Sequence, residues 1–205
     1  MKRDLLKTIC LIFGISVSIN EGLPLADANG NFPPYLDPVG IVTICYGVVP
    51  EPTDHIKASY TKKDCDELLD KTVMEYSVVV KDLPPLVLSS YIGLLDFGYN
   101  AGIYAANNSN VKKCLMKSDY NCASKAILQW KYVSKKKITD KDRRYGKWSF
   151  NGTKYNFDCS QYVNGKPNKL CYGIWKRRLY ESDLLKGTMN DKEAIIKYME
   201  LRKWE

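Results

Sequence analysis

Apolar residues recur at helical spacing over much of the chain. Between residues 85 and 102, Leu88, Tyr91, Ile92, Leu95 and Tyr99 repeat every three or four positions in a largely apolar segment. This pattern predicts a buried helix at the centre of the core. Further helices are predicted at 61–83, 109–116, 122–133, 171–187 and 191–204.

Residues 35–47, with the sequence YLDPVGIVTICYG, are strand-like instead. Residues that favour strands flank the tetrapeptide Asp-Pro-Val-Gly, in which Pro38 suits the second position of a turn and Gly40 its exit. The preceding stretch, 24–34, is rich in Pro and Gly and excludes a helix. We therefore expect a β-hairpin with Asp37 at its turn.

Between residues 134 and 170 the chain becomes polar, with three consecutive lysines at 135–137 followed by several Gly and Asn residues. This composition predicts an inserted region of exposed loops with room for one hairpin. A chain of 205 residues is long enough for one sizeable core, so we expect residues 1–205 to form a single domain.

The composition excludes a disordered chain and indicates an anionic partner. Hydrophobic residues make up 45% of the sequence, which is too much for intrinsic disorder. The formal net charge is +8, which fits nucleic acid, a membrane surface or an acidic glycan, and charge alone does not choose among them.

The cysteines and the single histidine bear on metal binding and on the redox compartment. His55 is the only histidine and no Cys-x-x-Cys spacing occurs, so we expect no metal site. Six of the seven cysteines fall into couples that are close in sequence, and Cys10 is left over. This arrangement favours disulfides in an oxidising compartment over buried free thiols in a reducing one.

The N-terminal residues 5–19 contain an apolar run after a basic start. The run from Ile9 to Ile19 has eleven residues, fewer than the about 20 that a stable membrane span requires. No small-x-small cleavage site precedes Glu21. Two interpretations remain equally open: a buried first helix that presents Glu21, or a weak export signal that is retained.

Glu21, Asp37 and Thr43 are the candidate catalytic residues. Glycoside hydrolysis needs two carboxyl groups in unlike environments, one protonated and one ionised. Apolar surroundings would keep Glu21 protonated, whereas Asp37 at a solvated turn would stay ionised. The hydroxyl of Thr43 could help Asp37 to hold a water. By pattern alone an Asp before Pro is more often a turn former, and Thr43 an ordinary strand residue.

Several segments resemble the phage-type lysozymes, the endolysin muramidases. EGLPL followed by YLDPVGIVTICYG is similar to the catalytic signature of that family, and LLDFGYNAG to its core helix. CASKAILQWKYV is similar to the helix that carries a tryptophan, and GIWKRRLYESDLL to the closing helix. The resemblance extends over about residues 15–187.

The resemblance implies an α+β, lysozyme-like fold, with a small β-hairpin lobe, a larger helical lobe and a cleft between them. In such a protein Glu21 would protonate the glycosidic oxygen. Asp37 and Thr43 would activate water on the opposite face, with net inversion. The implied substrate is the β-1,4 bond between N-acetylmuramic acid and N-acetylglucosamine in bacterial peptidoglycan. No cofactor or metal is implied, and we expect a monomer that binds no nucleic acid.

The resemblance also assigns secondary roles. One of Arg177 and Arg178 would orient Glu21, the alternative being a solvated basic face. Asn100 is a candidate substrate contact, although a helix terminus is its more ordinary role. Trp130 and Trp175 are expected in the core. The cysteines, which some exported relatives share, are paired as Cys45 with Cys65, Cys114 with Cys122, and Cys159 with Cys171.

The chain departs from the family pattern in two places. Fifteen residues separate Glu21 from Asp37, more than is usual, and we interpret the excess as an insertion at the lip of the cleft. The second departure is the long region 134–170.

Some relatives reach the periplasm through an N-terminal signal anchor, so we expect export with transient inner-membrane association through residues 5–19. The alternative is a cytoplasmic enzyme with holin-dependent release.

A rival function is a noncatalytic, basic protein that binds cell walls or disrupts membranes. Chitin is a further possible substrate.

Overall fold

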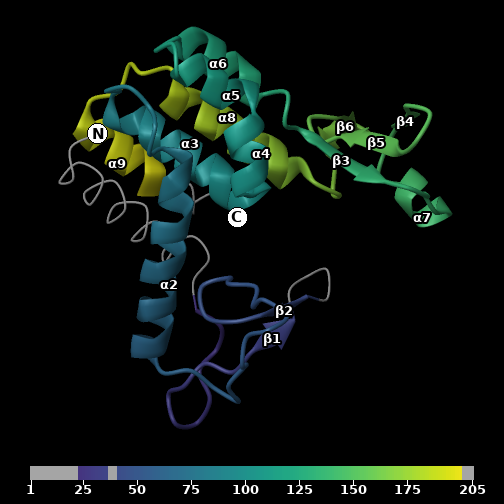
Figure 1. Ribbon diagram of the computed structural model, residues 1–205. Coiled ribbons are helices and arrows are strands. Elements are labelled where there is room, and N and C mark those ends of the chain that lie inside the picture. The colour runs from purple at the N-terminus through teal and green to yellow at the C-terminus, as the bar shows by residue number, and fades with distance from the viewer. Residues whose placement is uncertain (1–22, 37–40, 200–205) are drawn as a thin grey trace.

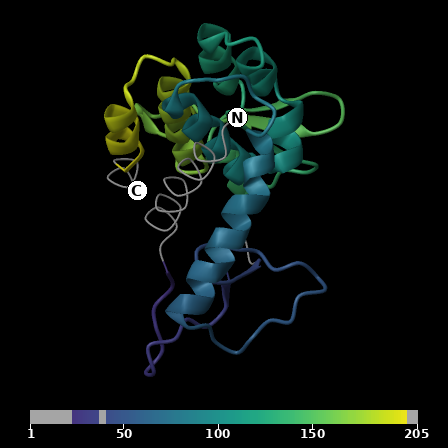
Figure 2. The same cartoon turned by 60° about the vertical axis from the view of Figure 1, so that its left-hand side comes forward.

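The computed structural model describes residues 23–36 and 41–199 as a mixed fold of helices and small antiparallel sheets (Figure 1). The expected α+β class is therefore confirmed. Figures 1 and 2 both show a long helix, α2, running from a small lobe of short strands to a larger helical body. The elements, in chain order, are β1 (Tyr35–Leu36), β2 (Val42–Thr43), α2 (Lys62–Tyr76), the 3-10 helix η1 (Ser77–Val79), α3 (Leu88–Ala101), α4 (Ile103–Asn108), α5 (Asn110–Leu115), α6 (Tyr120–Ile127), β3 (Tyr132–Lys135), α7 (Asp140–Arg143), β4 (Trp148–Phe150), β5 (Tyr155–Asp158), β6 (Tyr162–Val163), β7 (Lys166–Pro167), α8 (Tyr172–Leu185) and α9 (Asp191–Met199).

The small lobe contains the expected pair of antiparallel strands. Tyr35 pairs with Thr43, and Leu36 with Val42. Residues 37–40, which join the two strands, lie outside the described residues, so the turn expected at Asp37 stays a prediction. An isolated bridge between Phe32 and Tyr60 closes the other side of the lobe, where the chain enters α2.

Thr61 begins α2 as predicted, through a capping box with Asp64. The helix was expected to continue to residue 83, but it ends at Tyr76 and tightens into the 3-10 helix η1. Three consecutive valines at 78–80 account for this, because β-branched side chains crowd the preceding helical turn.

The core helix α3 confirms the periodicity seen in the sequence. Leu88, Tyr91, Ile92 and Leu95 are buried, and Tyr99 is partly buried. Helix α3 packs against α8, α4 and α9, so it lies at the centre of the helical body.

Gly93 allows a close approach of α3 and α8. A Cβ at Gly93 would lie 3.1 Å from Cβ of Leu184 and 3.2 Å from Cγ of Leu185, closer than ordinary van der Waals contact. The glycine therefore brings the functional residues of these two helices near one another.

The helix predicted at 122–133 is shorter than expected. Asp119 caps α6, and its side chain accepts a hydrogen bond from the amide of Cys122 at 2.9 Å. The helix ends at Ile127, and residues 132–135 form strand β3 instead. Those residues pair with β5, whose residues lie 20 to 26 positions away in sequence, so local periodicity does not reveal the contact.

The region 134–170 differs from the loops expected there. It contains a three-stranded antiparallel sheet in the order β3-β5-β4, the helix α7 and the hairpin β6-β7. Phe157 is fully buried within it, and the ring of Trp148 packs on Phe157 with centroids 5.1 Å apart. We call residues 131–171 the β-excursion; in Figure 1 it extends away from the helical body.

Three disulfides join the cysteine couples expected from the sequence. Their Cα–Cα distances are 5.1 Å for Cys45–Cys65, 5.6 Å for Cys114–Cys122 and 5.1 Å for Cys159–Cys171. Cys10, like the rest of segment 5–19, lies outside the described residues. None of the described helices has the length and apolarity to span a bilayer.

Candidate active site

Thr43 is the one predicted catalytic residue whose side chain the structure describes. It belongs to β2, opposite Tyr35, and only 3% of it is exposed. Its Oγ1 donates a hydrogen bond to the carbonyl oxygen of Ile41 at 3.1 Å. That bond uses the only donor proton of the hydroxyl and leaves its lone pairs free to accept. The hydroxyl of Thr43 is therefore oriented by Ile41 and can accept a hydrogen bond.

Glu21 and Asp37 lie outside the described residues, so their catalytic roles stay predictions. The described chain resumes close to each of them. Leu23, two residues after Glu21, packs against the hydrophobic core. Leu36 and Ile41, which flank residues 37–40, are exposed.

Helices α3 and α8 are joined by a bidentate ion pair. Nε of Arg177 donates to Oδ2 of Asp96 at 3.1 Å, and Nη2 donates to Oδ1 at 2.9 Å. Asp96 is 1% exposed. Burial by itself would raise the pKa of Asp96, but the charge and hydrogen bonds of Arg177 outweigh it and hold that pKa below its ordinary value.

Arg178 is buried beside this pair, at 1% exposure. Its Nη2 donates to Oδ1 of Asn100 and lies 3.0 Å from Oε1 of Glu181. Its guanidinium carbon lies 5.2 Å from the ring centroid of Phe97, a cation–π contact. The alternative of a solvated basic face is thus wrong for Arg178. Whether either arginine reaches Glu21 stays a prediction.

Asn100 lies in the last turn of α3, one residue before the helix ends at Ala101. Gly102 follows with φ of 91°, a conformation that favours glycine, and its amide donates to the carbonyl of Gly98 at 2.8 Å. The helix terminus is therefore the observed setting of Asn100. Its side chain acts from there as the partner of Arg178.

Two acids in this cluster, Asp96 and Glu181, were not among the residues predicted from the sequence. Glu181 is fully buried. Burial raises the pKa of Glu181 well above its ordinary value, opposed by the charge of Arg178 and reinforced by the nearby negative charge of Asp96. For Asp96 a signal was present, because an acid inside the largely apolar segment of α3 requires a buried counter-charge. The spacing of Arg178 and Glu181, i and i+3, offered another.

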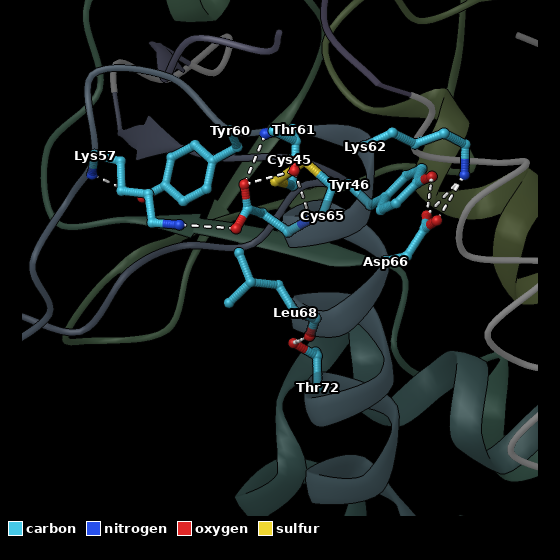
Figure 3. The surroundings of a disulfide bond; sticks show 11 residues. Cys45, Tyr46, Lys57, Tyr60, Thr61, Lys62, Cys65, Asp66, Leu68 and Thr72 are labelled. Carbon is cyan, nitrogen blue, oxygen red and sulfur yellow. Dashed lines mark hydrogen bonds and ion pairs between the residues drawn. A yellow bond between two sulfur atoms is a disulfide. The ribbon is translucent and has the colours of Figure 1, made fainter.

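A disulfide anchors the small lobe to α2 (Figure 3). Cys45 follows β2 by two residues and bonds to Cys65 in the first turns of the helix. Next to it, the hydroxyl of Tyr46 donates to Asp66 at 2.8 Å, and Nζ of Lys62 approaches the same carboxylate at 2.7 Å. The position of Thr43 relative to α2 is thereby fixed by covalent and polar links.

The two tryptophans that were expected in the core are only partly buried. Trp130 is 38% exposed and packs edge-on against Phe97, with centroids 4.8 Å apart. Trp175 is half-buried, and Nζ of Lys131 lies 5.4 Å from its ring. Among the residues that the structure describes, no group of three His, Cys, Asp or Glu side chains could hold a metal ion.

Comparison with known proteins identifies the family. Residues 29–146 match the phage lysozyme family model. A SAR-endolysin of Bacteriophage PS34 is 26% identical over 127 residues, which is 57% of this chain and 68% of that protein.

Solved structures are similar in fold. An endolysin from Escherichia coli O157:H7 phage FAHEc1 has a TM-score of 0.53 at 21% identity, and 93% of this chain and 95% of that chain are aligned. A P22 lysozyme mutant gives a TM-score of 0.50 at 21% identity, over 84% and 94% of the two chains. These likenesses confirm the lysozyme-like fold. The chain belongs to the phage lysozyme family and is a glycoside hydrolase that degrades peptidoglycan.

Proposed function

We propose that the protein is an endolysin that hydrolyses the β-1,4 bond between N-acetylmuramic acid and N-acetylglucosamine and thereby lyses the host cell. The observation that carries this proposal is the family match over residues 29–146, which includes Asp37 and Thr43. The buried, oriented hydroxyl of Thr43 supports it.

In the proposed reaction, the carboxylic acid of Glu21 donates its proton to the glycosidic oxygen as the bond to the anomeric carbon breaks. Water attacks that carbon from the opposite face. The carboxylate of Asp37 accepts a proton from the water, while Oγ1 of Thr43 accepts a hydrogen bond that orients it. The configuration at the anomeric carbon is inverted.

The polar cluster on α3 and α8 would support this chemistry by orienting the catalytic carboxyl group. The bidentate contact with Asp96 fixes the guanidinium of Arg177, which is still 20% exposed at its side chain. Arg178 is held by Asn100 and Glu181. Rigid guanidinium groups can orient a catalytic carboxyl group without reorganising during the reaction.

The test is loss of turbidity in a suspension of purified peptidoglycan, with wild-type protein and with Glu21→Gln. The amide is nearly isosteric but cannot donate the proton, so we expect activity to fall to below a few per cent with an unchanged circular dichroism spectrum. Glu51→Gln, at an exposed position, is the matched control and should keep full activity. A folded Glu21→Gln protein that clears the suspension would remove Glu21 from the acid role. It would also favour the noncatalytic rival.

We further propose export to the periplasm through residues 5–19, which stay attached in the mature chain. The three disulfides support an oxidising destination, and the SAR-endolysin name of one relative supports the signal-anchored subgroup. Fractionation of expressing bacteria with N-terminal sequencing tests this. A wholly cytoplasmic chain would contradict export and favour holin-dependent release. Cleavage before Glu21 would indicate a conventional signal peptide.

A further inference from the structure

The positive charge of the protein is concentrated in the β-excursion. Residues 131–171 contain eleven of the 31 lysines and arginines but only three of the 23 acidic residues, a net charge of +8. The other residues of the chain carry 20 charges of each sign. The whole net charge of the protein therefore resides in one inserted region.

Few of these charges are neutralised locally. Lys131 pairs with Asp158 at 2.8 Å, and Lys135 pairs with Asp142 at 2.6 Å. The remaining cations occupy exposed positions and form no ion pair with another described residue. They are Lys136, Lys137, Lys141, Arg143, Arg144, Lys147, Lys154, Lys166 and Lys169.

A folded framework holds these cations in place. Phe157 and Cys159 are fully buried, and Asn168, itself buried, donates to the carbonyl oxygens of Cys159 at 2.8 Å and Gln161 at 3.0 Å. The Cys159–Cys171 disulfide closes the base of the region. The backbone positions that carry the cations are therefore fixed, which reduces the entropy lost when a partner binds.

Aromatic and hydroxyl groups accompany the charge. Tyr132, Phe150 and Tyr162 are exposed by 49%, 57% and 60%. Ser134, Asn156 and Ser149 lie side by side on the three strands of the sheet. The hydroxyl of Ser134 donates to Oδ1 of Asn156, and the hydroxyl of Ser149 donates to its backbone carbonyl oxygen. Exposed rings beside hydroxyl and amide groups fit the apolar faces and hydroxyls of sugar rings, and the cations fit carboxylates.

The β-excursion leads directly into the helix of the candidate active site. Tyr172 begins α8, and Arg177 follows five residues later, about 8 Å along the helix axis. A polymer bound between the lobes could therefore contact the β-excursion at the same time. Two linked contacts on one chain strengthen binding through a high effective concentration.

We propose that the β-excursion is an accessory surface that binds peptidoglycan, through the carboxylates of its stem peptides and the faces of its sugar rings, and retains the enzyme on the wall. This inference rests on the proposed function for the choice of polymer. Sugars with regularly spaced carboxylates match both the charge and the exposed rings. Nucleic acid and anionic lipid are the competing ligands that the experiment must separate.

The experiment measures binding of the full chain to purified sacculi in the Glu21→Gln background, so that no digestion occurs. One variant carries Lys136→Gln, Lys137→Gln and Arg144→Gln. The matched control carries Lys81→Gln, Lys117→Gln and Lys192→Gln, which remove the same charge from exposed positions elsewhere. We expect the first variant to bind about tenfold more weakly and the control to change less than about twofold. Equal losses, or no loss, would overturn the proposal.

A second set of variants tests whether the exposed aromatic side chains contribute to binding. Phe150→Ser with Tyr132→Ser should also weaken binding to sacculi, whereas Tyr104→Ser, at an exposed ring on α4, should not. Duplex DNA and vesicles of anionic phospholipid are measured in parallel. A charge effect confined to DNA or vesicles would contradict the proposal.

Hydrolysis of a short soluble muropeptide separates this proposal from the catalytic one. The accessory-surface variant, made with Glu21 intact, should cleave the soluble substrate at the wild-type rate while clearing sacculi more slowly. A wild-type enzyme that binds sacculi but cleaves neither substrate would refute the catalytic proposal alone. Slower cleavage of the soluble substrate by the variant would place the three substituted cations in the catalytic site and overturn the accessory role.

Discussion

Arg177 holds the buried carboxylate of Asp96 in a bidentate grip, with contacts of 3.1 and 2.9 Å that connect α8 to α3. A buried acid in an apolar helix is costly unless a cation compensates it. The pair therefore links the packing of the core to the position of the candidate active site.

We expect Arg177→Met to lower the free energy of unfolding by about 3–5 kcal/mol, because it leaves Asp96 buried without this counter-charge. Lys186→Met, at the C-cap of the same helix, is the control: Lys186 pairs with Asp183 at an exposed position, and its loss should change stability by less than about 1 kcal/mol. Urea denaturation measures both. Similar losses of unfolding free energy in the two variants would mean that the buried pair contributes no more to stability than the exposed one.

The proton on Glu181 should make stability depend on pH. Burial raises the folded-state pKa of Glu181 above its ordinary value of 4.5, so its contribution is complete below that value and is lost as the pH rises through the raised pKa. Asp96 has a lowered pKa and acts in the opposite direction, losing its contribution only as the pH falls below about 3.8.

Glu181→Gln imitates the protonated acid. We expect its free energy of unfolding to decline less than that of the wild type as the pH rises above 4.5. Denaturant titrations at several pH values provide the measurement, with Asp70→Asn on α2 as an exposed control. Parallel pH profiles for the wild type and Glu181→Gln would show that this carboxyl group does not hold the extra proton.

Thr43→Val should separate catalysis from folding. The substitution keeps the shape of the side chain and loses one hydrogen bond, to Ile41, so stability should fall by only about 1 kcal/mol. Removal of the water-orienting hydroxyl should slow lysis at least about tenfold, in line with the weight of a positioned catalytic group. Thr43→Ser restores the hydroxyl and should recover much of the rate. A fully active Thr43→Val enzyme would exclude the hydroxyl from the reaction.

Loss of the Cys159–Cys171 disulfide should loosen the β-excursion alone. The bond spans 12 residues, and a loop of this size contributes about 2–3 kcal/mol. In a Cys159→Ala/Cys171→Ala protein, trypsin should cut faster within 131–171 while the helical body keeps its circular dichroism. The matched protein, Cys114→Ala/Cys122→Ala, affects α5 and α6 and should leave cleavage in the β-excursion unchanged. Equal protection of the β-excursion in both proteins would contradict this.

Local signals were enough to predict α3 and α8. Their apolar positions repeat at helical spacing, and burial of Tyr91, Ile92 and Leu95 follows from that repeat. The beginning of α2 was likewise predicted at Thr61, and the structure adds the capping box with Asp64. The cysteine couples could be paired because each is close in sequence.

The β-excursion could not be predicted in the same way. Its strands have two to four residues, and the pairing of β3 with β5 depends on residues 20 to 26 positions apart. Such short strands carry almost no alternation from which to infer a face. The partnership of Arg178 with Asn100 was equally hidden, since it depends on how α8 packs against α3.

Mass spectrometry of the fragments released from purified peptidoglycan would identify the bond that the enzyme cuts. We expect disaccharide-peptides with N-acetylmuramic acid at the reducing end, absent after treatment with Glu21→Gln. Fragments with reducing N-acetylglucosamine, cleavage of the peptide stems, or intact glycan chains after complete incubation would contradict this expectation.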